Sequence, residues 1–353
     1  MSIDCEAVPQ VSEKVLHICY MDKFIPAFID FVREEVGGSH NHFHLIENNR
    51  HYPYRSGEDT EEQTSKFGFF GLYFKMRRYD KIVLHGLFNK YVILLLALNP
   101  RLLRRCYWVM WGGDLYSYKA RKKTLKKKFV ERCRRKVIRD MGHLVTYVPG
   151  DVELARQWYG AKGRYAESFV YPSNLYKPLN VPEKEAEDAT LTVLIGNSAS
   201  RSNEHFEAFA RLAALTRTNV RVICPLSYGD LKYAKRVIER GQELFGDRFT
   251  ALTDFMPLED YLKLLGEVDI ALFAHRRQQA MGNLITLLGL GKKVYIRREI
   301  TPWSMFESLN VKVFDMDELN LATLDSDTAS HNREIISAYF SRERLARQLK
   351  DIL

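Results

Sequence analysis

The chain has 353 residues, of which 46% are hydrophobic and 27% are charged. This length exceeds what one hydrophobic core usually holds, and the hydrophobic content excludes a disordered chain, so we expect two folded domains of similar size. The formal net charge is +9, but twelve Lys or Arg residues and only one acid lie between Lys119 and Arg139, and the rest of the chain holds 41 basic and 43 acidic residues. The basic charge therefore indicates one anionic partner surface, either a membrane or a nucleic acid.

The cysteines, the first residues and the apolar runs of the chain indicate the cellular compartment to expect. The five cysteines lie far apart and form no C-x-x-C motif. We therefore expect neither a zinc site nor a disulfide framework, and a reducing cytoplasm fits. The first ten residues lack a basic start followed by an apolar run, so we expect no secretory signal. The longest apolar run, Tyr91 to Leu98, is too short to span a bilayer, so any membrane contact is expected to be peripheral.

Strand-like runs alternate with helical patterns along the whole chain, which predicts an α/β fold with parallel sheets. In the first half the strands are predicted at Val15–Tyr20, Phe43–Glu47, Lys81–His85, Tyr107–Trp111 and Leu144–Val148. In the second half they are predicted at Leu191–Ile195, Val220–Cys224, Phe249–Thr253, Asp269–Ala274 and Lys293–Arg297. A charged, proline-containing stretch reads as a linker over residues 175–190. It would join a domain over residues 1–174 to one over 191–330, and a last helix is predicted over 331–353.

Polar clusters follow the carboxyl ends of five of these strands. They are His85 and Gly86, Gly112 to Asp114, Asn197 and Ser198, Pro225 to Tyr228, and Arg276 to Gln279. In open α/β sheets ligands gather at this edge, where helix starts also point. We expect a cleft between the two domains to collect these clusters.

The stretch from Leu191 to Phe209 is the most informative of these. A β-branched strand runs into the small polar loop of Gly196, Asn197, Ser198 and Ser200, and a helix opens near Asn203. Unpaired backbone N–H groups at a helix start carry partial positive charge, so this loop suits a phosphate. An ordinary turn uses the same residue types, and both interpretations stay open here.

A second anion site is predicted after the strand that ends at Ala274. His275, Arg276, Arg277, Gln278 and Gln279 precede a helix that begins near Gly282. Guanidinium groups offer a planar fork of donors to phosphate oxygens, so the cluster matches a diphosphate. A solvated basic turn is the alternative.

Two residues are candidates for a general base. Asp114 follows two glycines at a strand end between Trp111 and Tyr116, and a carboxylate partly buried among aromatics can deprotonate a sugar hydroxyl. Its alternative role is a helix cap. His85 occupies the equivalent place after another strand and would be a base or a donor to a leaving phosphate, although a satisfied core histidine is the commoner case. Glu204 would complement a helix dipole or hold a sugar hydroxyl.

No metal site is predicted. His40, His42 and His44 alternate without any accompanying Cys or acidic ligand, and Asp315 and Asp317 lie in a stretch that reads as a solvated acidic turn. The GLGKK sequence at residues 289–293 lacks full P-loop spacing, which disfavours an ATPase.

The basic segment predicts an amphipathic helix at a membrane surface. Leu125, Phe129, Cys133 and Val137 recur every four residues and are flanked by cations. The expected membrane-binding residues are Lys122, Lys123, Lys126, Lys127, Lys128, Arg134 and Arg135. The apolar stripe could equally pack on the first domain and leave its cations outward. Nucleic acid is not expected as the partner, because base-stacking aromatics are not interleaved with the cations.

Four motifs together resemble glycosyltransferase family 56. They are GNS followed by RSNEH (Gly196 to His205), WGGDLY (Trp111 to Tyr116), RQQ followed by a glycine (Arg277 to Gly282), and LHG with FN (Leu84 to Asn89). The likeness runs from about Ile82 to about Trp303. The first eighty residues and the C-terminal helix match poorly, which bears on acceptor recognition.

The resemblance implies a GT-B architecture, in which two Rossmann-like domains face each other across a cleft and the C-terminal helix can cross back to the first domain. The second domain would hold a nucleotide-sugar donor without a metal or other cofactor. Residues implied for the donor site are Gly196, Asn197, Ser198, Arg201, Ser202, Asn203, Glu204, Arg277, Gln278, Gln279, Gly282 and Asn283, with Tyr228 facing the base. Asp114 would be the general base if the sugar configuration inverts, with His85 behind it.

The resemblance therefore implies a glycosyltransferase that moves a deoxy or acetamidodeoxy sugar from a TDP-type donor, similar to TDP-Fuc4NAc, to a polyprenyl-diphosphate-linked or other glycan acceptor. It would work peripherally on the cytoplasmic face of a bacterial inner membrane. The alternative is a non-catalytic lipid- or nucleic-acid-binding protein on a Rossmann-like scaffold. Donor turnover separates the two.

Overall fold

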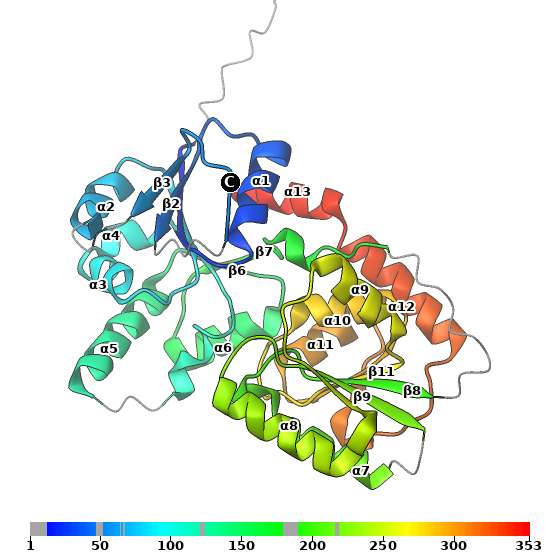
Figure 1. Cartoon of the computed structure of the whole chain (residues 1–353). Helices are drawn as coiled ribbons and strands as arrows, with labels where there is room; N and C mark the ends of the chain where they lie inside the picture. Colours follow the sequence, from blue (N-terminus) through cyan, green and yellow to red (C-terminus); the bar gives the residue numbers. More distant parts are fainter. Residues whose placement is uncertain are drawn as a thin grey trace, which may run out of the picture. The chain divides into compact units, whose positions relative to one another are not determined.

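A computed structural model describes residues 13–46, 52–63, 65, 68–120, 124–178, 190–215 and 219–353 (Figure 1). The chain divides into two compact units. The first contains the residues up to Tyr147, Val152–Pro172 and Leu345–Leu353, and the second contains Val148–Asp151 and Ser173–Arg344.

The first unit is built on a seven-stranded, all-parallel sheet with the order β3-β2-β1-β4-β5-β6-β7. The strands are β1 (Val15–Tyr20), β2 (Asn41–Ile46), β3 (Thr60–Gln63), β4 (Lys81–His85), β5 (Cys106–Val109), β6 (His143–Thr146) and β7 (Arg164–Glu167). The strand order reverses between β1 and β4. In such a sheet this switch point opens a crevice at the carboxyl ends of the strands.

Helices cover both faces of this sheet. They are α1 (Ile25–Glu35), α2 (Gly68–Met76), α3 (Lys90–Leu98), α4 (Pro100–Leu103), α5 (Leu125–Asp140), α6 (Pro149–Tyr159) and α13 (Arg342–Ile352), with short 3-10 turns at Tyr116–Lys119 and Pro172–Asn174. One core cluster contains Leu72 of α2, Ile93 of α3 and Ile138 of α5 together with Trp108 of β5. Helices α2, α3 and α5 therefore pack side by side on the same face of the sheet.

The second unit repeats the architecture with six parallel strands in the order β10-β9-β8-β11-β12-β13. The strands are β8 (Leu191–Ile195), β9 (Val220–Pro225), β10 (Phe249–Leu252), β11 (Ile270–Phe273), β12 (Lys293–Ile296) and β13 (Phe314–Asp315). The helices are α7 (His205–Leu215), α8 (Leu231–Phe245), α9 (Leu258–Glu267), α10 (Met281–Gly289), α11 (Thr301–Ser308) and α12 (Ser326–Tyr339), with 3-10 turns at Arg201–Asn203, Gly246–Arg248 and Met316–Glu318. Its switch point lies between β8 and β11.

All ten predicted strands are present, and the described part of the chain contains three more that the pattern did not predict. These are β3, β7 and β13, each the last strand at a sheet edge. Edge strands keep one side open to solvent, so they lack the apolar run or alternation that marks an interior strand. Thr60–Gln63, for example, has no buried residue.

The predicted linker and C-terminal helix need correction. Tyr176 belongs to the second unit, where its hydroxyl donates to the Gly289 carbonyl at 2.7 Å, whereas residues 179–189 lie outside the described part of the chain. The single helix predicted over 331–353 is two helices, α12 and α13, which are separated at Phe340 and Ser341. The chain returns to the first unit at Leu345, as expected, and Gln348 Oε1 there accepts from the Phe169 backbone N–H.

Candidate functional site

The loop after β8 in the second unit is folded around Asn203. Its Nδ2 donates to the carbonyl and hydroxyl oxygens of Ser198 at 2.9 and 3.1 Å, and its Oδ1 accepts from the Asn197 N–H at 3.2 Å. Gly196 has φ +70°, and an added Cβ would lie 2.7 Å from Nε2 of His205. The buried side chains of Ser198 and Asn203 thus shape the loop from inside, and their contact with a ligand stays a prediction.

Side-chain hydrogen bonds join this loop to the loop after β11. Gln279 Nε2 donates to Asn197 Oδ1 at 3.1 Å, and the Ser202 hydroxyl donates to Gln279 Oε1 at 2.7 Å. Asn197 Nδ2 also donates to the Tyr228 hydroxyl, in the loop after β9, at 3.1 Å. The two predicted anion loops therefore form one connected polar surface at the switch point of the second sheet.

Helix α10 begins at this surface without a side-chain cap. The preceding residue, Ala280, has a left-handed backbone with φ +58°, and among the described residues no side chain accepts from the first N–H groups of the helix. Unsatisfied N–H groups at a helix start attract an anion. The neighbouring residues are the predicted ones: Arg277 donates to the Gln278 carbonyl at 3.1 Å, Gly282 occupies the first turn, and Asn283 Nδ2 donates to the Tyr261 hydroxyl at 2.8 Å.

Arginines beside the loops converge on one carboxylate. Glu207 of α7 accepts from Arg211, Arg276 and Arg297, and the bonds from Arg297 and then Arg211 lower the pKa of Glu207. Arg297 is buried and also donates to the Ala274 carbonyl at 2.8 Å. We did not predict Glu207 or Arg297 as site residues, although Arg297 follows the end of β12 and the strand-end rule applies to it.

Two further predicted site residues lie beside side chains of opposite charge. Glu204, with a left-handed φ of +51°, lies 3.8 Å from the Arg276 guanidinium. Exposed Arg201 lies 3.7 Å from Asp230, and its guanidinium sits 5.4 Å from the centre of the Tyr233 ring. Both remain at the rim of the loop after β8.

In the first unit, Asp114 is fully buried and holds two loops together. Its Oδ2 accepts from Trp108 Nε1 at 2.7 Å and from the Leu87 N–H at 3.0 Å. Its Oδ1 accepts from the N–H groups of Trp111 at 3.1 Å and Leu115 at 2.9 Å. Burial raises its pKa, while these four donors oppose the rise. In this structure the carboxylate has no surface on which to meet an acceptor hydroxyl, so the general-base role stays a prediction and the structural role is the one the contacts support.

His85 lies in a buried polar chain. Its Nε2 lies 3.2 Å from His17 Nδ1, and its Nδ1 lies 2.7 Å from the Tyr171 hydroxyl. Trp111 Nε1 donates to the same hydroxyl at 2.8 Å. Burial lowers the pKa values of both histidines, that of His17 to about 4. These contacts support the interpretation of His85 as a satisfied core histidine, and its catalytic role stays a prediction.

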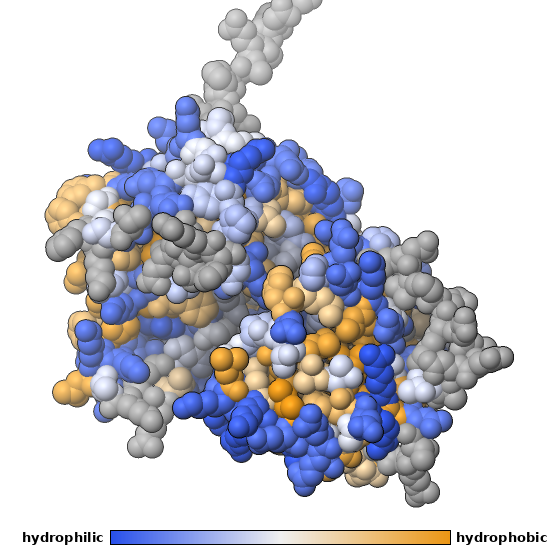
Figure 2. Space-filling model, in the orientation of Figure 1, coloured by the Kyte–Doolittle hydropathy of each residue, from blue (hydrophilic) through white to orange (hydrophobic). Residues whose placement is uncertain are grey.

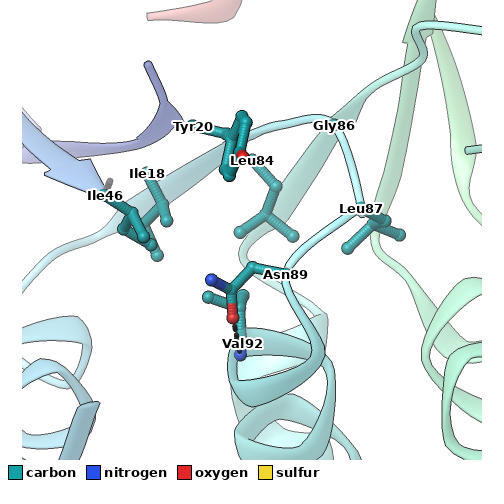
Figure 3. A pocket seen from close by; sticks show the side chains of 8 residues that line it. All are labelled: Ile18, Tyr20, Ile46, Leu84, Gly86, Leu87, Asn89 and Val92. Carbon is teal, nitrogen blue, oxygen red and sulfur yellow. Dashed lines mark hydrogen bonds between the residues drawn. The ribbon is translucent and has the colours of Figure 1, made fainter. Parts of the chain in front are cut away.

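A small, mostly apolar hollow lies at the switch point of the first sheet, beside these loops (Figure 3). Its lining is Ile18, Tyr20, Ile46, Leu84, Gly86, Leu87, Asn89 and Val92. Asn89 caps α3, because its Oδ1 accepts from the N–H groups of Tyr91 and Val92. None of the predicted catalytic side chains lines this hollow.

The predicted membrane-binding residues separate into four groups. Lys122 and Lys123 lie outside the described residues, whereas Lys126, Lys127 and Lys128 are exposed on α5. Arg134 is a correction: its side chain is nearly buried, 3.7 Å from Glu131 and 3.4 Å from the Asp114 carbonyl. Arg135 is half-exposed and covers the Tyr118 ring.

Within the described part of the chain no cluster of three His, Cys, Asp or Glu side chains could hold a metal ion. Helices long and apolar enough to cross a membrane are also absent from the described residues.

Several solved structures share this architecture. HepE of Anabaena, solved with UDP and glucose, superposes with a TM-score of 0.66 at 15% identity, covering 96% of this chain and 99% of that one. Sucrose-phosphate synthase of Thermosynechococcus elongatus gives 0.62 at 13% identity, covering 96% and 98%. WaaG, a glycosyltransferase of lipopolysaccharide biosynthesis, gives 0.57 at 11% identity, covering 96% and 94%. The fold is the GT-B fold of glycosyltransferases.

The sequence places the chain more narrowly. The model of the 4-alpha-L-fucosyltransferase family, glycosyl transferase group 56, matches residues 72–349, and the chain belongs to this family. It is a glycosyltransferase. The match extends into α2 and α13, which we had judged to resemble the family poorly.

Proposed function

We propose that the chain transfers a deoxy or acetamidodeoxy sugar from a nucleoside-diphosphate donor of the TDP type to a lipid-linked glycan, without a metal. Membership of the fucosyltransferase family supports a deoxy sugar. The UDP and UDP-glucose bound to HepE support a nucleotide sugar as donor.

The start of α10 carries this proposal. It lies at the carboxyl end of β11, beside the switch point, it is uncapped, and Arg277 and Gln279 precede it. The donor diphosphate would accept from the free N–H groups and from these side chains. Such preorganised donors stabilise the charge that develops on the leaving diphosphate, which is the work that a divalent metal does in other transferases.

Binding of TDP and UDP, measured by calorimetry, tests the site. Arg277→Ala is expected to weaken binding about tenfold or more, because charge-assisted hydrogen bonds to phosphate contribute about 1.5–3 kcal/mol. Arg240→Ala, on the exposed side of α8, is the matched control and should bind as wild type. Equal affinity in Arg277→Ala and wild type would remove the diphosphate site from α10.

Donor choice and metal dependence are tested by turnover. TDP-Fuc4NAc is expected to be consumed in the presence of a lipid-linked acceptor and excess EDTA, whereas UDP-glucose is not. Activity that requires added Mg²⁺ or Mn²⁺ would contradict a donor site in which protein hydrogen-bond donors alone bind the diphosphate.

A further inference from the structure

The apolar stripe of α5 is divided into a buried half and an exposed half. Val137 is buried in the core of the first unit, but Leu125 is 83% exposed and Phe129 is 60% exposed. Large hydrophobic side chains at these positions contribute nothing to the core of the unit. The first two turns of α5 therefore present an apolar surface that no described residue covers.

The cations on the same turns are not paired with acids. Lys126, Lys127, Lys128 and Arg132 are exposed and have no acidic partner among the described residues. Glu131 is the one acid of α5 before Asp140, and it is buried beside Arg134 and Arg135. These cations are therefore available to bind an anion from outside the chain.

Helix α2 offers a second exposed apolar surface. Phe70 is 75% exposed, Phe74 is 47% exposed, and their rings stack edge to face with centroids 5.3 Å apart. Lys75 and Arg77 follow on the same helix and at its end. Figure 2 shows hydrophobic atoms over α2 and at the free tip of α5, each beside hydrophilic atoms.

The parallel topology places both surfaces at one edge of the unit. A helix that follows a parallel strand begins at the carboxyl edge of the sheet, so the first turns of α2 and α5 both lie there. The hollow of Figure 3 lies at the same edge. Both helices also pack on the same face of the sheet.

We propose that Phe70, Phe74, Leu125 and Phe129, with Lys126, Lys127, Lys128 and Arg132, form a docking face for an anionic lipid bilayer. The aromatic and leucine side chains enter the boundary between headgroups and acyl chains, and the cations contact lipid phosphates. This orientation turns the carboxyl edge of the first sheet to the membrane. The inference deepens the proposed function, on which it rests for the lipid-linked acceptor.

Flotation of the full chain with vesicles tests the face. Strong binding is expected to phosphatidylcholine vesicles that contain 30% phosphatidylglycerol, and weak binding to phosphatidylcholine alone. The variant K126Q/K127Q/K128Q is expected to lower the partition coefficient about a hundredfold, since each cation near an anionic leaflet contributes about fivefold. K232Q/K235Q/R236Q, on exposed positions of α8, is the charge control and should float as wild type.

Insertion is tested separately from charge. F70S/F74S and L125S/F129S are each expected to lower binding at least tenfold, whereas Leu231→Ser should not. Leu231 is 79% exposed but begins α8 of the second unit, outside the proposed face. In Phe70→Trp, the emission should shift to the blue with anionic vesicles and be quenched by brominated acyl chains.

Three results would overturn the inference. The first is vesicle binding that does not depend on the phosphatidylglycerol content. The second is an equal loss of vesicle binding in the α5 variants and in their controls. The third is tight binding to a DNA oligonucleotide that depends on the same lysines, together with no flotation. TDP binding in solution separates this inference from the proposed function, because the docking variants should bind TDP as wild type. If the wild-type chain binds TDP but does not float with anionic vesicles, only the docking face is refuted, and if it floats but does not bind TDP, only the donor site is refuted.

Discussion

Gln279 Nε2 donates to Asn197 Oδ1 at 3.1 Å, and this bond links the loop after β8 to the loop after β11. The two loops are 82 residues apart in sequence. Ser202 completes the connection through Gln279 Oε1. A donor diphosphate on α10 would therefore rest on a surface whose geometry depends on both loops.

Gln279→Ala is expected to weaken TDP binding about tenfold, because it removes a ligand donor and releases Asn197 and Ser202. A double-mutant cycle with Asn197→Ala, measured by calorimetry, should show coupling of about 0.5–1.5 kcal/mol. Strictly additive losses would mean that the two loops act independently.

Asp114→Asn is expected to lower the free energy of unfolding by about 3 kcal/mol. An amide can accept through one oxygen only, so two of the four donors around Asp114 would face an NH₂ group. Urea unfolding measures this loss, and Asp254→Asn, at an exposed position, is the control. An Asp114→Asn protein of unchanged stability that has lost transfer would instead favour the general-base role.

Gly196→Ala is expected to destabilise the second unit and to abolish measurable TDP binding. The new Cβ would have a left-handed φ of +70° and would lie 2.7 Å from His205 Nε2, in the buried base of the donor loop. Gly160→Ala is the matched control, since φ there is +67° and the nearest atom to the new Cβ, Cγ of Arg139, lies 3.8 Å away. It should cost only about 1–2 kcal/mol of backbone strain. Equal effects of the two substitutions on TDP binding would contradict the role of Gly196.

Stability is expected to fall as the pH is lowered from 7 to 5. Burial lowers the pKa values of His17 and His205 from 6.5 to about 4 and that of His275 to about 3. Between pH 6.5 and 4 the unfolded chain therefore binds protons that the folded chain does not, so stability rises with pH by up to about 1.4 kcal/mol per pH unit for each histidine.

Urea titrations across this range measure the slope, which should decrease in His205→Gln. His331→Gln, at an exposed position, should keep the wild-type slope. A free energy of unfolding that stays constant from pH 7 to 5 would refute the neutral, buried state of these histidines.

Much of the structure of the loop after β11 could be predicted because its signals are local. The apolar run of β11, the polar residues up to Gln279 and the glycine at the start of α10 are consecutive, and the parallel topology fixes the edge at which they lie. The Glu207 cluster could not be predicted in this way. It joins α7 to residues that follow β11 and β12, and nothing in the local sequence around Glu207 marks it as their partner.

The sequence by itself determined the two α/β halves, their interior strands and the polar strand ends, because burial in a parallel sheet imposes a continuous apolar run at each strand. Tertiary structure alone decided what several of those polar residues do. Asp114 lies at a strand end, where ligands gather, but four donors from three segments surround it and close it off. The apolar residues of α5 likewise recur every four positions along the whole helix. Only the packing of the helix on the sheet determines that Val137 is buried and Leu125 is not.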